Sequence, residues 1–195
     1  MQRISAARAA GWPCGAERDA AVAARGRAFS RMAARAAPVR PIVCGGGSTL
    51  AGKAVAVPMV ESVGYEGCDI DVFVADLVRR DVDVLVDVRL NAVSRRRGFS
   101  KTALSNALES AGIEYRHLRA LGNPKQNRAA FSGDNVETGR AIYRGLLDSP
   151  AAAAEMAQLM ELAEAGHVAV MCFERNEQHC HRKVVLDKLR FARTG

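Results

Sequence analysis

Short apolar runs alternate with stretches of helical periodicity from residue 60 onward. Most of these runs are rich in valine and are only six to eight residues long, which is typical of strands. One of them, "VDVLVDVR", is almost continuously apolar, as expected for a strand that is covered on both faces. The pattern predicts strands at residues 60–65, 82–89, 113–118 and 167–173.

Helical periodicity fills the segments between the predicted strands. Asp69 and Ser100 stand where helix N-caps are expected, and Gly112 stands where a left-handed C-cap belongs. Ser149 precedes a proline that suits a first helical turn. The pattern predicts helices after Asp69 and Ser100, helices over 138–148 and 150–165, a long loop over 119–137, and a last helix from Cys180 or His181 to about 193.

The predicted order of elements is β-α-β-α-β-α-α-β-α, which is typical of a parallel α/β fold with right-handed crossovers. We therefore predict a compact three-layer α/β domain with a mainly parallel sheet of four or more strands. In such sheets the ligand site lies at the carboxyl ends of the strands. Polar and cysteine residues gather at these predicted ends: Tyr65, Asp87, Arg89, Asn123, Cys172 and Glu174.

The positive charge of the chain is concentrated ahead of the predicted domain. The formal net charge is +7, and residues 1–58 alone hold nine basic residues against two acidic ones. This segment is rich in Ala and Arg and has no sustained periodicity, so we predict a poorly ordered extension to one domain over residues 59–195. A basic tail, a targeting peptide and a start codon assigned too far upstream all fit; Met59, just before the first predicted strand, favours the last.

Two features of the sequence bear on location. No stretch approaches the roughly 20 apolar residues that a membrane span needs. The chain holds five cysteines, an odd number, and no apolar core of a secretory signal precedes them. We therefore predict a cytoplasmic protein that does not bind a membrane.

Four motifs in the predicted domain resemble those of a known family. They are "VGYEG", then "VDVLVDVR" with its Ser-Arg-rich loop and "GFSK", then "AGIEYRHLRALGNP", and finally "CFERNEQHCHR". Their order resembles the domain-of-unknown-function 488 family over about residues 60–191. The resemblance implies a compact α/β fold and brings no activity with it. Cys172, Glu174, Cys180, His181 and Arg182 match the family's terminal motif C-x-E-x5-C-H-R, and Asp87 and Arg89 match its second-strand motif.

The terminal motif combines metal ligands with thiols. Zinc accepts side chains such as Cys172, Cys180 and His181, with His179 or Glu174 as a fourth ligand. The spacing lacks a C-x2-C pair, however, and adjacent Cys180 and His181 at a helix start are expected to point in different directions. We therefore predict no bound metal and no cofactor. Cys180 is a candidate reactive thiol, because a helix N-terminus favours thiolate, although either cysteine also fits a core position.

A further interpretation combines the polar residues into an anion site. Arg89, Arg182 and the N-terminus of the last helix supply donors for a phosphate, and the arginine loop over 95–97 adds positive charge. We hypothesise a phosphate-bearing or nucleotide-like ligand at the carboxyl edge of the sheet, with hydrolysis or transfer as the reaction. The predicted catalytic residues are Asp87, Glu174, His181 and Cys180, and the predicted ligand-binding residues are Tyr65, Arg89, Arg95, Asn123 and Arg182.

Two functions from other classes stay open. A non-catalytic adaptor would bind nucleic acid or protein through Arg95, Arg96 and Arg97, because consecutive arginines near an aromatic residue suit a nucleic-acid backbone. A solvated basic loop explains the same arginines equally well. A redox or metal-binding domain would instead use Cys172 and Cys180.

Overall fold

The structure is a computed structural model that describes residues 60–131, 133 and 135–191. The predicted extension over 1–58 and the alternative start at Met59 lie outside the described residues. In chain order the elements are β1 (Val60–Gly64), α1 (Ile70–Arg79), β2 (Val84–Asp87), α2 (Lys101–Ser110), β3 (Glu114–His117), the 3-10 helix η1 (Arg119–Leu121), α3 (Lys125–Phe131), α4 (Val136–Leu146), α5 (Pro150–Ala165), β4 (Val168–Cys172), the 3-10 helix η2 (Glu177–His179) and α6 (Arg182–Phe191).

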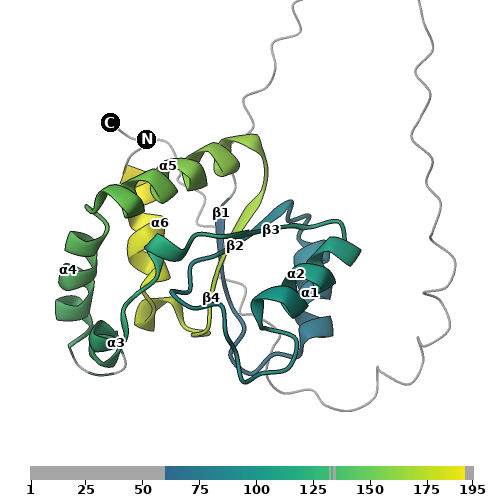
Figure 1. Ribbon diagram of the computed structural model, residues 1–195, viewed down its shortest axis with the longest axis horizontal. Coiled ribbons are helices and arrows are strands. Elements are labelled where there is room, and N and C mark those ends of the chain that lie inside the picture. Colours follow the sequence, from purple (N-terminus) through teal and green to yellow (C-terminus); the bar gives the residue numbers. More distant parts are fainter. Residues whose placement is uncertain (1–59, 132, 134, 192–195) are drawn as a thin grey trace, which may run out of the picture. The chain divides into compact units, whose positions relative to one another are not determined.

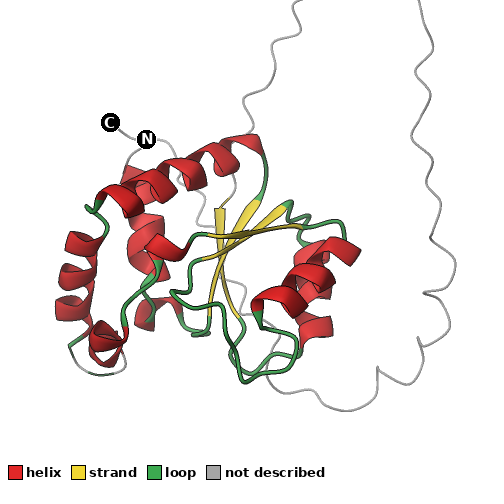
Figure 2. Ribbon diagram, viewed as in Figure 1, coloured by secondary structure: helices red, strands yellow, loops and turns green. Residues whose placement is uncertain are grey.

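The four strands form a parallel sheet in the order β1-β4-β2-β3 (Figure 2). β4 is the last strand along the chain but lies between β1 and β2 in the sheet, and all five of its residues are buried. At the carboxyl edge, Gly64 of β1 pairs with Cys172, and Asp87 of β2 pairs with Met171. The segments that follow three neighbouring strands therefore leave the sheet at one edge.

Helices cover both faces of the sheet (Figure 1): α1 and α2 lie on one side, and α4, α5 and α6 lie on the other. Each face buries its own apolar cluster, which is the main source of stability in a domain of this size. The first cluster includes Phe73, Leu77, Leu85, Leu104, Leu108 and Met171, and the second includes Val86, Tyr143, Leu159, Val170, Val185 and Leu189. The predicted three-layer α/β fold is confirmed.

The segment over 119–137 is not the continuous loop that its composition predicts. It contains η1 and α3, and the α3 region begins at a proline. The backbone N–H of Asn127 donates to the carbonyl oxygen of Pro124 (3.1 Å), which closes the first turn. The loop prediction was wrong because a Gly-Asn-Pro sequence is typical of a turn but also suits a helix start.

The last helix begins slightly later than predicted. α6 starts at Arg182, and Cys180 has extended backbone angles (φ −133°, ψ 145°) between η2 and α6. The side chain of Cys180 therefore leaves an extended segment rather than a helical turn. This backbone change decides where the two residues of the Cys-His pair point.

No helix in the described ranges is long and apolar enough to cross a membrane.

Candidate functional site

A pocket of about 590 Å³ opens at the carboxyl edge of the sheet. Segments that follow all four strands contribute to its wall, as expected for a ligand site in a parallel sheet. Of the predicted site residues, Tyr65, Arg89, Arg95, Asn123, Glu174, Cys180 and His181 line the pocket, whereas Asp87 and Arg182 are absent from its lining.

Asp87 and Arg89 form a buried ion pair at the wall of the pocket, with Arg89 in the lining and Asp87 beneath it. Arg89 donates from Nε and Nη2 to both carboxylate oxygens of Asp87, at 2.6–3.1 Å. Its Nη1 donates to the hydroxyl of Tyr65 and to the carbonyl oxygen of Phe99, both at 2.9 Å. Tyr115 donates its hydroxyl to Asp87 at 2.7 Å. The pair therefore ties the end of β2 to the segments after β1 and before α2.

The protonation of this network follows from burial and from the charge on Asp87. Burial by itself lowers the pKa of Arg89, but the hydrogen bond and the charge of Asp87 raise it above its ordinary value overall. Burial raises the pKa of Tyr115, and the nearby carboxylate of Asp87 raises it further. Arg89 is thus a charged guanidinium and Tyr115 a neutral donor, which is what a stable ion pair at this depth requires.

Arg182 lies inside the domain. Its side chain is fully buried, and its Nη2 donates to the backbone carbonyl oxygen of Glu174 at 2.6 Å. Its Nε and Nη1 have no hydrogen-bond partner within the described ranges. Arg182 therefore holds the backbone after β4, and its positive charge is buried without a carboxylate partner among the residues described.

Four side chains of the terminal motif converge at the pocket. The Sγ atoms of Cys172 and Cys180 both lie 3.1 Å from Oε2 of Glu174. The same two Sγ atoms lie 3.9 Å and 3.8 Å from Nδ1 of His181. We call these four residues the Cys-Glu-His cluster; their ligand atoms all lie within 4.8 Å of one another.

The orientation within the cluster differs from the sequence expectation. Cys180 and His181 were predicted to diverge at a helix start, but both side chains reach the same point. They converge because Cys180 is extended and α6 begins only after His181. Adjacent side chains on a helix point about 100° apart, whereas the change of backbone conformation between these two residues redirects one of them.

His181 is held in one orientation from its far side. Its Nε2 lies 3.0 Å from the carbonyl oxygen of Val88, and the ring of Tyr143 packs against it edge-on with centroids 5.2 Å apart. Because the Val88 carbonyl can only accept, Nε2 carries a proton and Nδ1 faces the cysteines. Burial alone lowers the pKa of His181, but Cys180, the Val88 carbonyl and Glu174 raise it overall.

The pKa values of Glu174 and Cys180 are shifted in opposite directions. Burial by itself raises the pKa of Glu174, but hydrogen bonds from the thiols of Cys172 and Cys180 lower it overall. Burial raises the pKa of the Cys180 thiol well above its ordinary range, and Cys172 raises it further. Near neutral pH the cluster therefore pairs the carboxylate of Glu174 with the protonated thiol of Cys180.

Cys180 is expected to alkylate slowly in the folded, metal-free protein. A raised pKa leaves less thiolate at any pH below that pKa, and the side chain is also buried. With iodoacetamide at pH 8 and a chelator present, we expect the rate to be at least about tenfold lower than in urea-unfolded protein. Peptide mass spectrometry measures both rates at Cys180, and equal rates would contradict the burial and raised pKa of this thiol.

The sequence places this domain in a family. A family model described as "Domain of unknown function DUF488" matches residues 69–189. The chain belongs to the DUF488 family. The match confirms the predicted family. It extends from the residue before α1 into α6 and covers three of the four motifs, while "VGYEG" lies ahead of it. Searches among curated proteins and among solved structures found no match.

Among the pocket residues of this DUF488 domain that the sequence-based predictions missed, two bear on ligand binding. Arg128 lies on α3, in the segment that was interpreted as a loop. Phe173 follows β4 and was counted as part of the strand, yet its side chain is 44% exposed and lines the pocket. An apolar residue directly after the end of a parallel strand is a usable signal for a pocket wall, and a correct helix assignment for α3 would have found Arg128.

Proposed function

We propose that this pocket binds a phosphate-bearing, nucleotide-like ligand. The observation that carries the proposal is that, besides the paired Arg89, three arginines line the same pocket as the exposed ring of Phe173: Arg95, Arg96 and Arg128. Guanidinium groups match the geometry of phosphate oxygens, and an exposed ring offers a stacking surface to a base. The two kinds of group therefore suit the two ends of a nucleotide.

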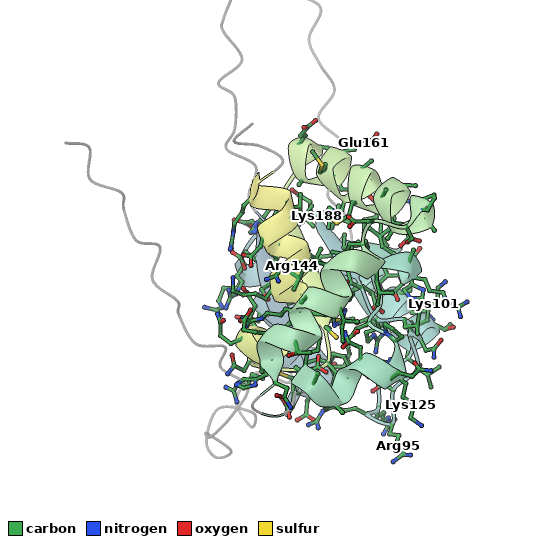
Figure 3. The ribbon with its side chains drawn as sticks, turned by 90° about the vertical axis from the view of Figure 1, so that its left-hand side faces the viewer. Arg95, Lys101, Lys125, Arg144, Glu161 and Lys188 are labelled. Carbon is green, nitrogen blue, oxygen red and sulfur yellow. The ribbon has the colours of Figure 1, made fainter. Side chains whose placement is uncertain are left out.

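The arginines differ in how firmly they are held. Arg95 is exposed and has no polar partner in the described part of the chain, and Figure 3 shows its side chain extended at the lower end of the domain. Arg96 donates from Nε to the carbonyl oxygen of Cys68. Arg128 donates from Nε to the carbonyl oxygen of Asn123 at 3.2 Å. A phosphate would thus meet one adaptable and two positioned guanidinium groups.

The aromatic wall is positioned by a small stack. Tyr65 stacks on Phe99 with ring centroids 4.3 Å apart and an interplanar angle of 10°. Phe173 meets Tyr65 edge-on, with centroids 5.3 Å apart and an angle of 81°. Because the hydroxyl of Tyr65 also accepts from Arg89, the ion pair of Asp87 and Arg89 fixes this wall. Tyr65 therefore orients the ring of Phe173, and part of that ring stays exposed to a ligand.

Chemistry on the ligand, as hydrolysis or transfer, would take place beside Glu174 and His181. These are the predicted catalytic residues that, with Cys180, line the pocket. Asp87 is fully buried and committed to Arg89 and Tyr115, so in this proposal it acts as a positioning residue. Arg89 positions Tyr65 in the same way, and Arg182 holds the backbone of Glu174.

A matched pair of arginine variants tests the proposal. Arg95 lines the pocket, whereas Arg97, two residues away on the same exposed loop, is absent from its lining. In a thermal-shift panel of nucleoside mono-, di- and triphosphates, phosphate and pyrophosphate, we expect a nucleotide to stabilise the wild type. Arg95→Ala is expected to lower the affinity for that nucleotide about tenfold, since a hydrogen bond to a charged group is lost. Arg97→Ala is expected to leave the affinity unchanged.

The same variants separate the pocket from the nucleic-acid alternative. An adaptor that uses the loop would bind a single-stranded oligonucleotide, lose affinity equally in Arg95→Ala and Arg97→Ala, and show a steep salt dependence. If no nucleotide or phosphate in the panel shifts the melting temperature while both variants weaken oligonucleotide binding equally, the pocket proposal is wrong.

A further inference from the structure

We propose that the Cys-Glu-His cluster binds a zinc ion through Sγ of Cys172, Sγ of Cys180, Nδ1 of His181 and the carboxylate of Glu174. This site shares Glu174, Cys180 and His181 with the proposed reaction but uses none of the arginines of the proposed ligand site, and it does not rest on the proposed function. Zinc uptake needs only these four side chains, and all four line the floor of the pocket. The ion would therefore be open to exchange with solvent.

The distances within the cluster suit a tetrahedral ion. With zinc–sulfur bonds of about 2.3 Å and zinc–nitrogen or zinc–oxygen bonds of about 2.0–2.1 Å, neighbouring ligand atoms of a tetrahedron lie about 3.5 Å apart. The sulfur–oxygen distances are 3.1 Å and the sulfur–nitrogen distances are 3.8 Å and 3.9 Å, so the four edges bracket that value. The other two of the six edges, between the two Sγ atoms and between Nδ1 and the carboxylate, are no longer than 4.8 Å, so shifts of up to about 1 Å would complete the coordination.

The far side of His181 is arranged as for a metal ligand. A ligating histidine usually donates its second ring N–H to a carbonyl or carboxylate, which fixes the tautomer and turns the other nitrogen toward the metal. The carbonyl of Val88 does this here, 3.0 Å from Nε2, and Nδ1 points to the two sulfur atoms. This orientation is fixed by the domain and does not depend on an ion.

The chemistry of the donor set selects the type of ion. Two thiolates and an imidazole favour zinc over magnesium or calcium, which prefer oxygen ligands. Two thiolates and one carboxylate around Zn²⁺ leave a net charge of −1. Arg182 is the residue after His181, is fully buried, and has no carboxylate partner in the described ranges. A negative cluster next to this arginine would supply the counter-charge that its burial calls for.

Titration of the reduced, chelator-stripped full chain with Co²⁺ and Zn²⁺ tests the site. We expect one equivalent of Co²⁺ to bind, with the intense thiolate-to-cobalt absorption and ligand-field bands of a tetrahedral site, and Zn²⁺ to displace it. His181→Gln and Cys180→Ser are each expected to weaken zinc by more than about 100-fold, since losing a ligand costs more than losing a supporting hydrogen bond. Circular dichroism of each variant checks that it folds.

Two control variants separate this site from its surroundings. His179→Gln removes a neighbouring histidine that lines the pocket but whose Nδ1 lies 3.2 Å from the carbonyl oxygen of Phe131, outside the cluster. The His179→Gln variant is expected to bind zinc as the wild type does. Arg95→Ala is also expected to bind zinc normally, because Arg95 contacts only the proposed phosphate ligand. A protein that binds zinc but no nucleotide would thus refute the ligand proposal and leave this one standing.

Four results would each overturn the zinc site. If the reduced wild-type protein takes up no stoichiometric Co²⁺, the site does not exist. Cobalt bound without a thiolate absorption band would place the ion elsewhere. Equal zinc affinity in His181→Gln and His179→Gln would do the same. A Cys172–Cys180 disulfide in fresh protein that, once reduced, takes up no cobalt would assign the cysteines to redox chemistry instead.

Discussion

Replacing Asp87 by alanine is expected to lower the free energy of unfolding by about 3–5 kcal/mol, because it leaves a buried guanidinium without its partner. Asp87 is fully buried and Arg89 is 6% exposed, so water cannot replace the lost carboxylate. The hydrogen bond from Tyr115 is lost as well. Urea denaturation followed by circular dichroism measures the difference, and the midpoint should fall with little change in slope.

An exposed ion pair on the same sheet provides the control. Glu114 pairs with Arg116 on β3, and both side chains are about half exposed (45% and 48%). Glu114→Ala should cost less than about 1 kcal/mol, as exposed pairs generally do. The double variant Asp87→Ala/Arg89→Met should be more stable than Asp87→Ala alone, since it removes the buried charge. A cost for Asp87→Ala no larger than that for Glu114→Ala would show that the pair does not anchor the pocket wall.

Replacing Gly64 by alanine is expected to cost about 3 kcal/mol, at the upper end for an overpacked site. A Cβ at Gly64 would lie 2.0 Å from the carbonyl oxygen of Glu174 and 2.8 Å from the Cα of Arg175. Both contacts are with backbone, so no side-chain rotation relieves them. The segment after β4 must move, and Glu174 moves with it. We therefore expect reduced thermal stability together with weaker zinc binding.

A second glycine gives the matched control for that variant. Gly145 lies in α4, and a Cβ there would meet no atom within 4 Å. Gly145→Ala should raise stability by roughly 0.5–1 kcal/mol, because glycine is unfavourable in a helix. If Gly64→Ala behaves like Gly145→Ala, the backbone of Glu174 is not held by close approach to β1.

The site at the carboxyl edge of the sheet could be predicted because its position follows from the order of the strands and helices. Alternating strands and helices predict a parallel sheet, and a parallel sheet brings the ends of distant strands to one edge. That is why Tyr65, Arg89, Asn123 and Glu174, which are far apart in the sequence, line one pocket. A partner for Asp87 could be expected as well, since a carboxylate at the end of so apolar a strand must be paired. Arg89, Arg182 and the N-terminus of the last helix all fit the sequence, and the structure shows that the partner is Arg89.

The geometry of the Cys-Glu-His cluster could not be read from spacing alone. The convergence of Cys180 and His181 depends on one extended residue before α6, and helix boundaries are among the least certain features of a sequence pattern. The orientation of His181 depends on Val88, a backbone carbonyl in a distant part of the chain. The burial of Arg182 could not be predicted from the sequence either, because arginine side chains are mostly exposed.

The most direct test of the central claim is to locate a bound nucleotide on the protein. Photoaffinity labelling with 8-azido-ATP, followed by proteolysis and peptide mass spectrometry, identifies the residues that contact the base. The account predicts labelled peptides that contain Phe173 or the segment over 90–96, competed by unlabelled ATP and reduced in Arg95→Ala. Labelling that is confined to residues 97–101, or that ATP does not compete, would contradict it.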